Sequence, residues 1–249
     1  MMTDAELAAH LATVAGKLLL QVRDCGVTTG TSLGKSGDQT ANQYLIHAIA
    51  EARPDDGLLS EESKDTDTRL SKSRVWIIDP VDGTREYGEK DLQGRGRTDW
   101  AVHVALAVDG IASVGAVAMP ALGLTLRSDQ PAPLGRLPET PRMVVSRSRP
   151  AKEALQVAEA IGAALIPMGS AGAKAMAIVR GEAEIYLHTG GQYEWDSCAP
   201  VAVAAAYGLH VSRADGRPLV YNQRDTYMPD LLICRREWAD NVLAITKPR

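Results

Sequence analysis

The chain has 249 residues, of which 45% are hydrophobic and 23% charged, and its formal net charge is −4 at pH 7. This acidic balance argues against non-specific binding to nucleic-acid polymers, which requires a basic surface. It also means that an anionic substrate would need a compensating cation.

The N-terminus and the cysteines indicate the compartment. No run reaches the roughly 18–20 apolar residues that span a bilayer, and the first residues are acidic where a signal peptide is basic. Cys25, Cys198 and Cys234 are odd in number, far apart and without metal-ligand spacing. We therefore expect no disulfide framework, no membrane partner and a reducing cytoplasm.

The first half of the chain predicts helices followed by strands. Apolar residues recur at helical spacing from Leu7 to Val22, and a second helix is predicted from about Asp38 to Ala52. Runs rich in β-branched and apolar residues then predict strands over 57–60, 74–79, 100–108, 111–119 and 122–126. The Asp109-Gly110 pair is typical of a hairpin turn and favours an antiparallel meander.

The second half predicts alternating strands and helices. Four prolines between residues 130 and 141 mark a boundary between an N-terminal α+β lobe, residues 1–135, and a C-terminal α/β lobe, residues 140–249. Beyond them, strands are predicted over 143–146, 164–168, 184–188 and 231–234, and helices over 151–161, 171–180, 196–207 and near the C-terminus. The first lobe would carry most of the metal ligands, and the second would complete the active site.

The run Trp-Ile-Ile-Asp-Pro-Val-Asp-Gly-Thr, residues 76–84, is the most informative stretch. An apolar strand delivers Asp79 at its end, where the following proline disfavours helix. A positive φ at Gly83 would turn the chain sharply, so that Asp79 and Asp82 converge on one point. The amides of Gly83 and Thr84 would then form a phosphate cradle.

Converging carboxylates repel one another unless a cation lies between them. Mg²⁺ prefers oxygen ligands and combines carboxylates with substrate phosphate oxygens, which would also solve the charge problem of an acidic protein. The alternative interpretation of the same residues is a surface turn, which Asp, Pro and Gly commonly form.

Three further features are informative when they are considered together with this run. Glu61 and Glu62 follow a predicted strand, although paired glutamates are usually solvated. Asp196 precedes an apolar helix and could be a simple N-cap. Arg147 and Arg149 follow a strand and could clamp a second phosphate, or lie exposed at a domain edge.

Taken together, Asp-x-x-Asp-Gly-Thr, the upstream Glu-Glu and the downstream Trp-Asp-x-x-Ala-Pro resemble the inositol monophosphatase-like family of Mg²⁺-dependent, lithium-sensitive phosphatases. The resemblance spans nearly the whole chain, from Asp38 to the helix after Asp196. It implies the five-layer αβαβα sandwich of the inositol monophosphatase and fructose-1,6-bisphosphatase type, and a homodimer. It also implies two or three Mg²⁺ ions per site, Mn²⁺ as a substitute, and inhibition by Li⁺ and Na⁺.

The resemblance also assigns roles to residues. The metal ligands would be Glu61, Asp79, the backbone carbonyl of Val81, Asp82 and Asp196, and the pair that orients the attacking water would be Asp38 and Thr84. The substrate-binding residues would be Gly83, Thr84, Ser146, Arg147, Arg149, Gly169, Ser170 and Asp196. One departure is the Gly-rich segment before Asp38, residues 33–37, where the family pattern has Thr-x-Ala or Thr-x-Thr.

Within the family, residues 144–149 and 186–196 resemble the CysQ-type 3′(2′),5′-bisphosphate nucleotidases. This implies hydrolysis of the 3′-phosphate of adenosine 3′,5′-bisphosphate, and of its sulfated relative, in sulfur assimilation. Inositol phosphates and fructose bisphosphate are alternative substrates on the same fold. A haloacid-dehalogenase-type phosphatase is a further alternative, although its Asp-x-Asp spacing is one residue shorter, and so is a non-catalytic sensor of phosphonucleotides. The five histidines share no metal-ligand spacing and are interpreted as structural or surface residues.

Overall fold

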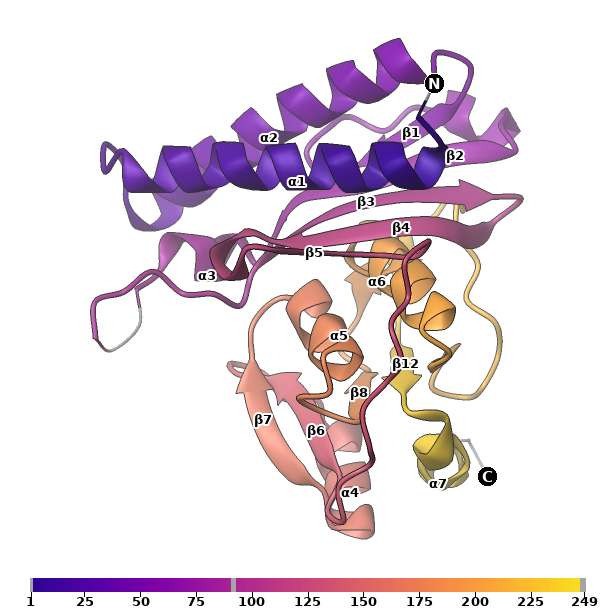
Figure 1. The fold of residues 1–249 in the computed structure, drawn as a ribbon. Coiled ribbons are helices and arrows are strands. Elements are labelled where there is room, and N and C mark those ends of the chain that lie inside the picture. Colours follow the sequence, from indigo (N-terminus) through magenta and orange to yellow (C-terminus); the bar gives the residue numbers. More distant parts are fainter. Residues whose placement is uncertain (1, 91–92, 247–249) are drawn as a thin grey trace.

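The computed structural model describes residues 2–90 and 93–246 of the chain. The predicted N-terminal helix is confirmed as α1 (Asp4–Asp24), which begins at a capping box: the Thr3 hydroxyl accepts the Glu6 amide, and the Glu6 carboxylate accepts the Thr3 amide. The apolar face of α1 is buried against the first sheet, and α2 (Gly30–Ala52) lies beside it on the same face (Figure 1).

The start of α2 differs from the prediction. The helix begins at Gly30 rather than near Asp38, so Asp38 lies inside the helix. Residues 28–37 are rich in Gly, Thr and Ser, which have low helix propensity. Packing outweighs this propensity, because the glycine positions Gly34 and Gly37 let α2 lie directly against Thr84 and Tyr87.

The first sheet has the order β1-β2-β3-β4-β5 among the described residues. Its strands are β1 (Gly57–Ser60), β2 (Arg74–Asp82), β3 (Ala101–Val108), β4 (Ile111–Met119) and β5 (Leu124–Arg127). β1 pairs with β2 in parallel and the other pairs are antiparallel, as the predicted meander requires. Asp109 (φ 50°) and Gly110 (φ 79°) form the expected hairpin turn. Both faces of β2 are buried, which explains its continuous apolar run.

The chain then descends through the proline-rich coil, residues 128–141, to a second sheet of order β10-β12-β8-β6-β7 (Figure 1). Its strands are β6 (Arg142–Ser146), β7 (Ala164–Met168), β8 (Ile185–His188), β10 (His210–Ser212) and β12 (Leu231–Cys234). Two short strands, β9 (Gln192–Tyr193) and β11 (Tyr227–Met228), pair separately and were missed by sequence analysis. The helices of this half are α4 (Lys152–Ile161), α5 (Ala171–Val179), α6 (Glu194–Ala206) and α7 (Arg236–Thr246).

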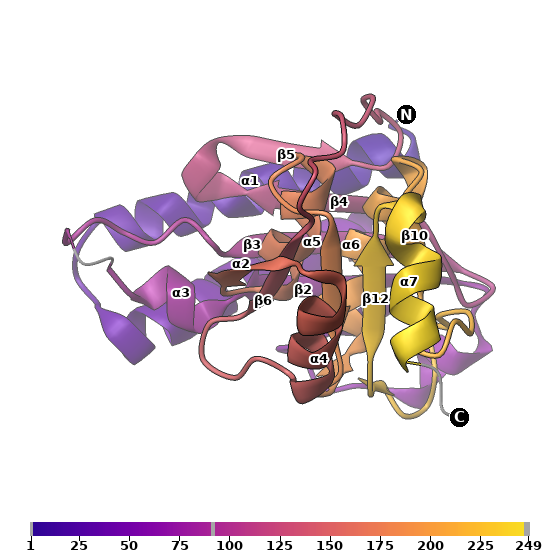
Figure 2. The ribbon, with the colours of Figure 1, turned by 90° about the horizontal axis from the view of Figure 1, so that it is seen from below.

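Within the described residues these elements stack in the five predicted layers (Figures 1 and 2). α1 and α2 cover the outer face of the first sheet, α5 and α6 lie between the sheets, and α4 and α7 cover the second sheet. The central hydrophobic core includes Ala105 of β3, Met176 of α5 and Val203 of α6. Because this core joins both halves, the lobe boundaries at 1–135 and 140–249 stay a prediction. In the described residues no helix is long and apolar enough to cross a membrane.

Candidate active site

The site lies where β2 ends and α3 (Thr84–Gly88) begins. The ladder between β2 and β3 is interrupted between Asp79 and Asp82, as expected around a strand proline. The Val81 amide donates to Asp79 Oδ1 (3.0 Å), which fixes that carboxylate. Gly83 has a φ of 87° and precedes the helix, as the sequence predicted. This turn therefore holds Asp79 and Asp82 together on a tight loop.

Asp196 completes the cluster from a different part of the chain. Carboxylate oxygens of Asp79, Asp82 and Asp196 lie within 4.8 Å of one another. Asp196 stands in the first turn of α6, where its carboxylate accepts the Tyr193 amide (2.7 Å). The N-cap of α6 is Tyr193, so the interpretation of Asp196 as an N-cap is wrong. Asp196 is the third residue of the helix, and its carboxylate joins the site.

Burial and mutual repulsion dominate the electrostatics of the cluster. Burial, followed by the charges of Glu61, Asp82 and Asp196, raises the pKa of Asp79 well above its usual range. Glu61 is exposed, yet partial desolvation and the Asp196 charge raise its pKa to about 8. Burial and the Asp82 charge raise the pKa of Asp196 to about 6. An oxygen-rich cluster whose charges repel fits a hard divalent cation such as Mg²⁺.

Asp82 is the exception, because the protein stabilises its charge. Burial alone would raise the pKa of Asp82, but the His103 ring and hydrogen bonds from the Ser170 hydroxyl and the Gly172 amide lower it to about 2. The Ala171 amide donates to its other oxygen (3.1 Å). Asp82 therefore anchors the N-terminus of α5, a favourable place for an anion. Ser170 has a φ of 48°, a strained conformation that these contacts hold in place.

Sequence analysis missed the role of His103. It lies directly opposite Asp79 in the β2–β3 ladder and is fully buried. Its Nδ1 is 3.0 Å from the Trp195 carbonyl, and its Nε2 is 3.1 Å from Asp82 Oδ2, an ion-pair contact outside good hydrogen-bond geometry. The Asp82 charge outweighs burial and raises the pKa of His103. The sequence contains a signal for this role, because His103 is a polar residue on a strand face whose other residues are alanines.

Asp38 faces the cluster from the middle of α2. Burial and the Glu62 charge raise the pKa of Asp38 to about 7, and a hydrogen bond from Thr84 acts in the opposite direction. Its Oδ1 is buried and has no hydrogen-bond partner within the described residues. The Thr84 hydroxyl also lies 3.1 Å from the Val81 carbonyl, to which it can donate. The structure thus brings Asp38 and Thr84 together, with a carboxylate oxygen left for a further ligand.

The Asp38–Thr84 pair depends on the close approach of α2 and α3. A Cβ at Gly34 would lie 2.6 Å from Thr84 Cγ2 and 3.4 Å from its carbonyl oxygen. We expect Gly34→Ala to displace Thr84 and to lower the kcat for phosphate-ester hydrolysis by roughly ten- to a hundredfold. Gly135→Ala is the control, since a Cβ there meets no described atom within 4 Å. Equal kcat values for the two variants would show that the contact does not position Thr84.

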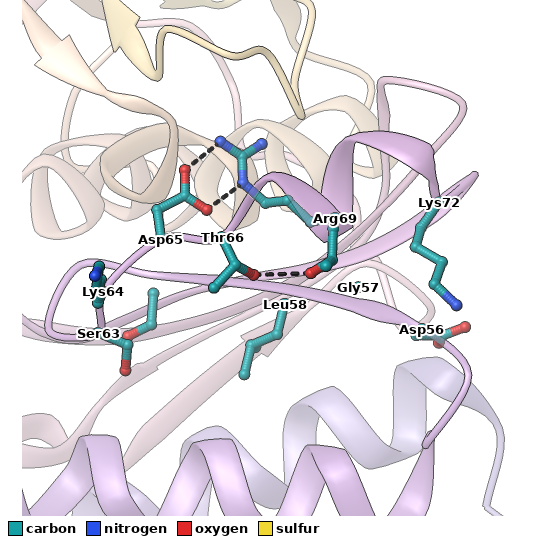
Figure 3. A pocket seen from close by; sticks show the side chains of 11 residues that line it. Asp56, Gly57, Leu58, Ser63, Lys64, Asp65, Thr66, Arg69 and Lys72 are labelled. Carbon is teal, nitrogen blue, oxygen red and sulfur yellow. Dashed lines mark hydrogen bonds and ion pairs between the residues drawn. The ribbon is translucent and has the colours of Figure 1, made fainter.

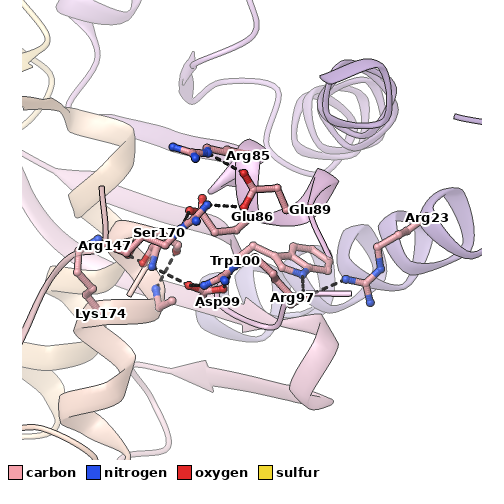
Figure 4. A network of polar contacts seen from close by, with 12 residues as sticks. Arg23, Arg85, Glu86, Glu89, Arg97, Asp99, Trp100, Arg147, Ser170 and Lys174 are labelled. Carbon is pink, nitrogen blue, oxygen red and sulfur yellow. Dashed lines mark hydrogen bonds and ion pairs between the residues drawn. The ribbon is translucent and has the colours of Figure 1, made fainter. Parts of the chain in front are cut away.

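Two of the predicted substrate-binding residues, Gly83 and Thr84, lie at the start of α3, and the others lie in the second half of the chain. Figure 4 shows two of these, Arg147 and Ser170, beside residues of the first half. Arg147 Nε donates to Glu86 (2.6 Å) and its Nη2 donates to Glu89 (2.6 Å), both from the first half. The Ser146 hydroxyl accepts the Arg149 amide (3.2 Å), and Arg149 is exposed. The structure therefore separates the two arginines: one joins the halves by ion pairs, and the other faces solvent.

Gly169 and Ser170 form the turn before α5. The Gly169 amide donates to Asp99 (2.7 Å), which in turn pairs with Arg97 (2.6 Å), so this turn is also held by the first half (Figure 4). A second residue that sequence analysis missed, Lys174, donates to the carbonyls of Gly169 (3.3 Å) and Ser170 (2.6 Å). Burial lowers the pKa of Lys174, while nearby carboxylates oppose this. A lysine inside the apolar run 171–179 was the signal for it.

The cavity in Figure 3, of about 300 Å³, lies behind the loop that follows Glu61. It is lined by Ser60, Ser63 and Lys64 among others, and the cluster carboxylates are not among its described lining residues. Its floor contains Arg69, which is 2% exposed and bound to Asp65 (2.7 Å).

Arg69 also ties this loop to residues 222–223. It donates to the Asn222 side chain (2.8 Å) and the Gln223 carbonyl (3.0 Å). The Glu194 carboxylate accepts the backbone amides of the same two residues (2.7 Å each). The loop carrying Glu61 is therefore linked through Arg69 to the start of α6, where Asp196 lies.

Comparisons with known proteins point to one family. A sequence profile described as the inositol monophosphatase family matches residues 3–247. The chain is 45% identical over 260 residues to the 3′-phosphoadenosine 5′-phosphate phosphatase of Mycobacterium leprae, with 99% of this chain and 94% of that protein covered. It is 48% identical over 240 residues to the protein of the same name from Mycobacterium tuberculosis, covering 92% and 88%.

The fold is also found among solved structures. CysQ from Bacteroides thetaiotaomicron aligns with a TM-score of 0.78 at 22% identity, over 94% of this chain and 97% of that one. This likeness shows a shared fold, and the family profile matches nearly the whole chain. The chain belongs to the inositol monophosphatase family.

Proposed function

We propose that this protein is a Mg²⁺-dependent phosphatase that removes the 3′-phosphate of adenosine 3′,5′-bisphosphate. The observation that carries the proposal is the convergence of Asp79, Asp82 and Asp196, together with a buried Asp38 oxygen that has no hydrogen-bond partner in the described part of the chain. The relatives at 45% and 48% identity, both named for this substrate, favour a nucleotide over an inositol phosphate. The sulfated relative of the substrate would fit the same reaction, and we expect a homodimer.

Glu61, Asp79, the Val81 carbonyl, Asp82 and Asp196 would hold two or three Mg²⁺ ions. When bound, these ions lower the pKa of water and neutralise charge on the phosphate. Mn²⁺ would substitute, and Li⁺ and Na⁺ would inhibit. The pKa values of Asp79, Glu61 and Asp196 are raised by burial and then by mutual repulsion, and bound cations would offset both by stabilising the ionised carboxylates.

Residues of the chain would move the proton and orient the phosphate. Asp38 Oδ1 would accept the proton of the attacking water, and the Thr84 hydroxyl would orient that water. The amides of Gly83 and Thr84 would face the transferring phosphate at the start of α3. Asp82, held ionised by α5 and His103, would fix the position of the second half of the chain relative to the first.

The two arginines should have different roles in specificity. Arg149→Ala should lower kcat/KM for adenosine 3′,5′-bisphosphate by about tenfold if Arg149 binds the phosphate that is not cleaved, because a charge-assisted hydrogen bond is lost. Hydrolysis of inositol 1-phosphate, which has a single phosphate, should change little. Arg147→Ala should impair both substrates, since it leaves Glu86 and Glu89 unpaired at the junction of the halves. If Arg149→Ala lowered kcat/KM equally for both substrates, the role of Arg149 would be structural.

A single turnover in ¹⁸O-labelled water tests the proposed reaction. We expect adenosine 5′-phosphate and one labelled oxygen in the released phosphate, with no label in the protein. A phosphorylated Asp79, trapped by acid quench, would instead support the aspartyl-phosphate mechanism of haloacid-dehalogenase-type enzymes. Binding of the nucleotide without hydrolysis in the presence of Mg²⁺ would support the alternative of a non-catalytic phosphonucleotide sensor.

A further inference from the structure

Three aromatic side chains gather at the surface beside Asp196. The rings of Tyr193 and Trp195 are stacked, with centroids 4.9 Å apart and planes inclined by 12°. Tyr227 meets Tyr193 edge-on, with centroids 6.0 Å apart. Tyr193 and Tyr227 are 46% and 49% exposed. The mechanism described above uses none of these rings.

The backbone fixes this aromatic cluster in position. Tyr193 of β9 and Tyr227 of β11 are directly paired in their short antiparallel ladder, so their side chains lie side by side. Gly191 has a φ of 80°, and a Cβ there would lie 2.2 Å from the Tyr227 hydroxyl oxygen. Tyr227 is therefore folded closely over a glycine, and the ladder holds the rings before any ligand arrives.

The backbone of the aromatic cluster is hydrogen-bonded to residues of the carboxylate site. The Tyr193 amide donates to Asp196 (2.7 Å), and the Trp195 carbonyl accepts from His103, which contacts Asp82. A substrate whose phosphate reaches Asp196 could thus extend its remainder toward these rings.

The exposure of these rings at the surface is unexpected in a chain that has few aromatic residues. The chain has four Trp, seven Tyr and no Phe, so aromatic side chains are scarce for the core. Trp76, Trp100, Tyr87 and Tyr221 are fully buried, as aromatic residues of a core are expected to be. Half-exposed, pre-ordered flat rings next to a reaction centre are suited to stack on a planar ligand group.

We propose that Tyr193, Trp195 and Tyr227 form a stacking platform for the purine base of the substrate. This inference rests on the proposed function, since a base is present only in a nucleotide substrate. The base would continue the stack of Tyr193 and Trp195, while the ribose places the 3′-phosphate at Asp196. The platform would then favour purine over pyrimidine bisphosphates, because the larger ring system stacks over more area.

The first test uses wild-type protein with Mg²⁺ and three pentose bisphosphates: adenosine 3′,5′-bisphosphate, cytidine 3′,5′-bisphosphate and ribose 3,5-bisphosphate. Inositol 1-phosphate is measured beside them. We expect kcat/KM for the three bisphosphates to fall in the order given, by about tenfold from the first to the last. Similar values for all three would overturn the platform and leave the proposed function intact. A preference for inositol 1-phosphate over all three would instead overturn the proposed function.

The second test assigns the effect to the rings. Tyr227→Leu removes a ring and keeps an apolar side chain, whereas Tyr227→Phe keeps the ring. The ratio of kcat/KM for adenosine 3′,5′-bisphosphate to that for ribose 3,5-bisphosphate should fall several-fold in the Leu variant and recover in the Phe variant. Quenching of Trp fluorescence by adenosine 5′-phosphate should weaken in parallel. An unchanged ratio, or a Leu variant altered only in its sedimentation, would make the aromatic cluster a protein contact and overturn the proposal.

Discussion

Asp79→Asn and Asp82→Asn are expected to lower kcat for adenosine 3′,5′-bisphosphate by about a thousandfold or more, equivalent to ~4 kcal/mol of barrier. Each change removes a charged oxygen ligand from a cluster whose oxygens lie within 4.8 Å of one another. Steady-state phosphate release at saturating Mg²⁺ measures the effect. Retention of more than about a tenth of the activity, a barrier change of only ~1.4 kcal/mol, would contradict the metal-binding interpretation.

The same two variants should differ in stability. Metal-free Asp79→Asn should be at least as stable as wild type at neutral pH. The pKa of Asp79 is raised in the folded state. Its carboxylate therefore destabilises the fold as the pH rises above the pKa that Asp79 has in the unfolded chain.

Asp82→Asn should lower the free energy of unfolding by an amount on the order of 2 kcal/mol. The pKa of Asp82 is lowered in the folded state, so the ionised carboxylate stabilises the fold at pH values above its unfolded-state pKa. This stabilisation is lost as the pH falls toward 2. Thermal or denaturant unfolding without metal tests this contrast. Equal shifts in both variants would contradict the electrostatic account of the two aspartates.

The second large effect is expected at Asp38. Asp38→Asn should lower kcat by roughly a hundred- to ten-thousandfold, the usual contribution of a general base. The carboxylate must be deprotonated to act. The pKa of Asp38 is about 7 without metal, and bound cations would lower it by stabilising the ionised carboxylate. The pH profile of activity should therefore have a rising limb whose midpoint lies at or below pH 7.

The pH profile distinguishes this role from a structural one. Asp38→Asn should lose the limb, whereas the exposed neighbour substitution Gln39→Ala should keep both the limb and the rate. Thr84→Val should lower kcat less than Asp38→Asn and should keep the limb, because the carboxylate remains. A wild-type limb that persists in Asp38→Asn would assign the titration to another group.

The local part of the site could be predicted from sequence because its determinants are contiguous. The strand, proline, two aspartates and glycine of residues 74–84 together specify the turn, and the structure has the expected positive φ at Gly83. The alternating pattern of residues 100–119 likewise predicts the meander. The strand that ends at Ser60, directly before Glu61, was predicted for the same reason.

The remainder depends on contacts between distant residues. The N-terminal turns of α2 are stabilised by glycines that face α3, and no local propensity signals this. The ion pairs of Arg147 with Glu86 and Glu89 join residues about sixty positions apart, so Arg147 could not be distinguished from Arg149 by local sequence pattern. His103 and Lys174 were missed because each acquires its role only when Asp82 or Ser170 is placed beside it.

The proposed function is tested most directly by kcat/KM of the wild-type protein for adenosine 3′,5′-bisphosphate, inositol 1-phosphate and fructose 1,6-bisphosphate, measured with Mg²⁺ and after chelation. We expect Mg²⁺-dependent hydrolysis with at least about a tenfold preference for the nucleotide, ~1.4 kcal/mol of barrier. A preference for inositol 1-phosphate or fructose 1,6-bisphosphate, or full activity after chelation, would contradict it.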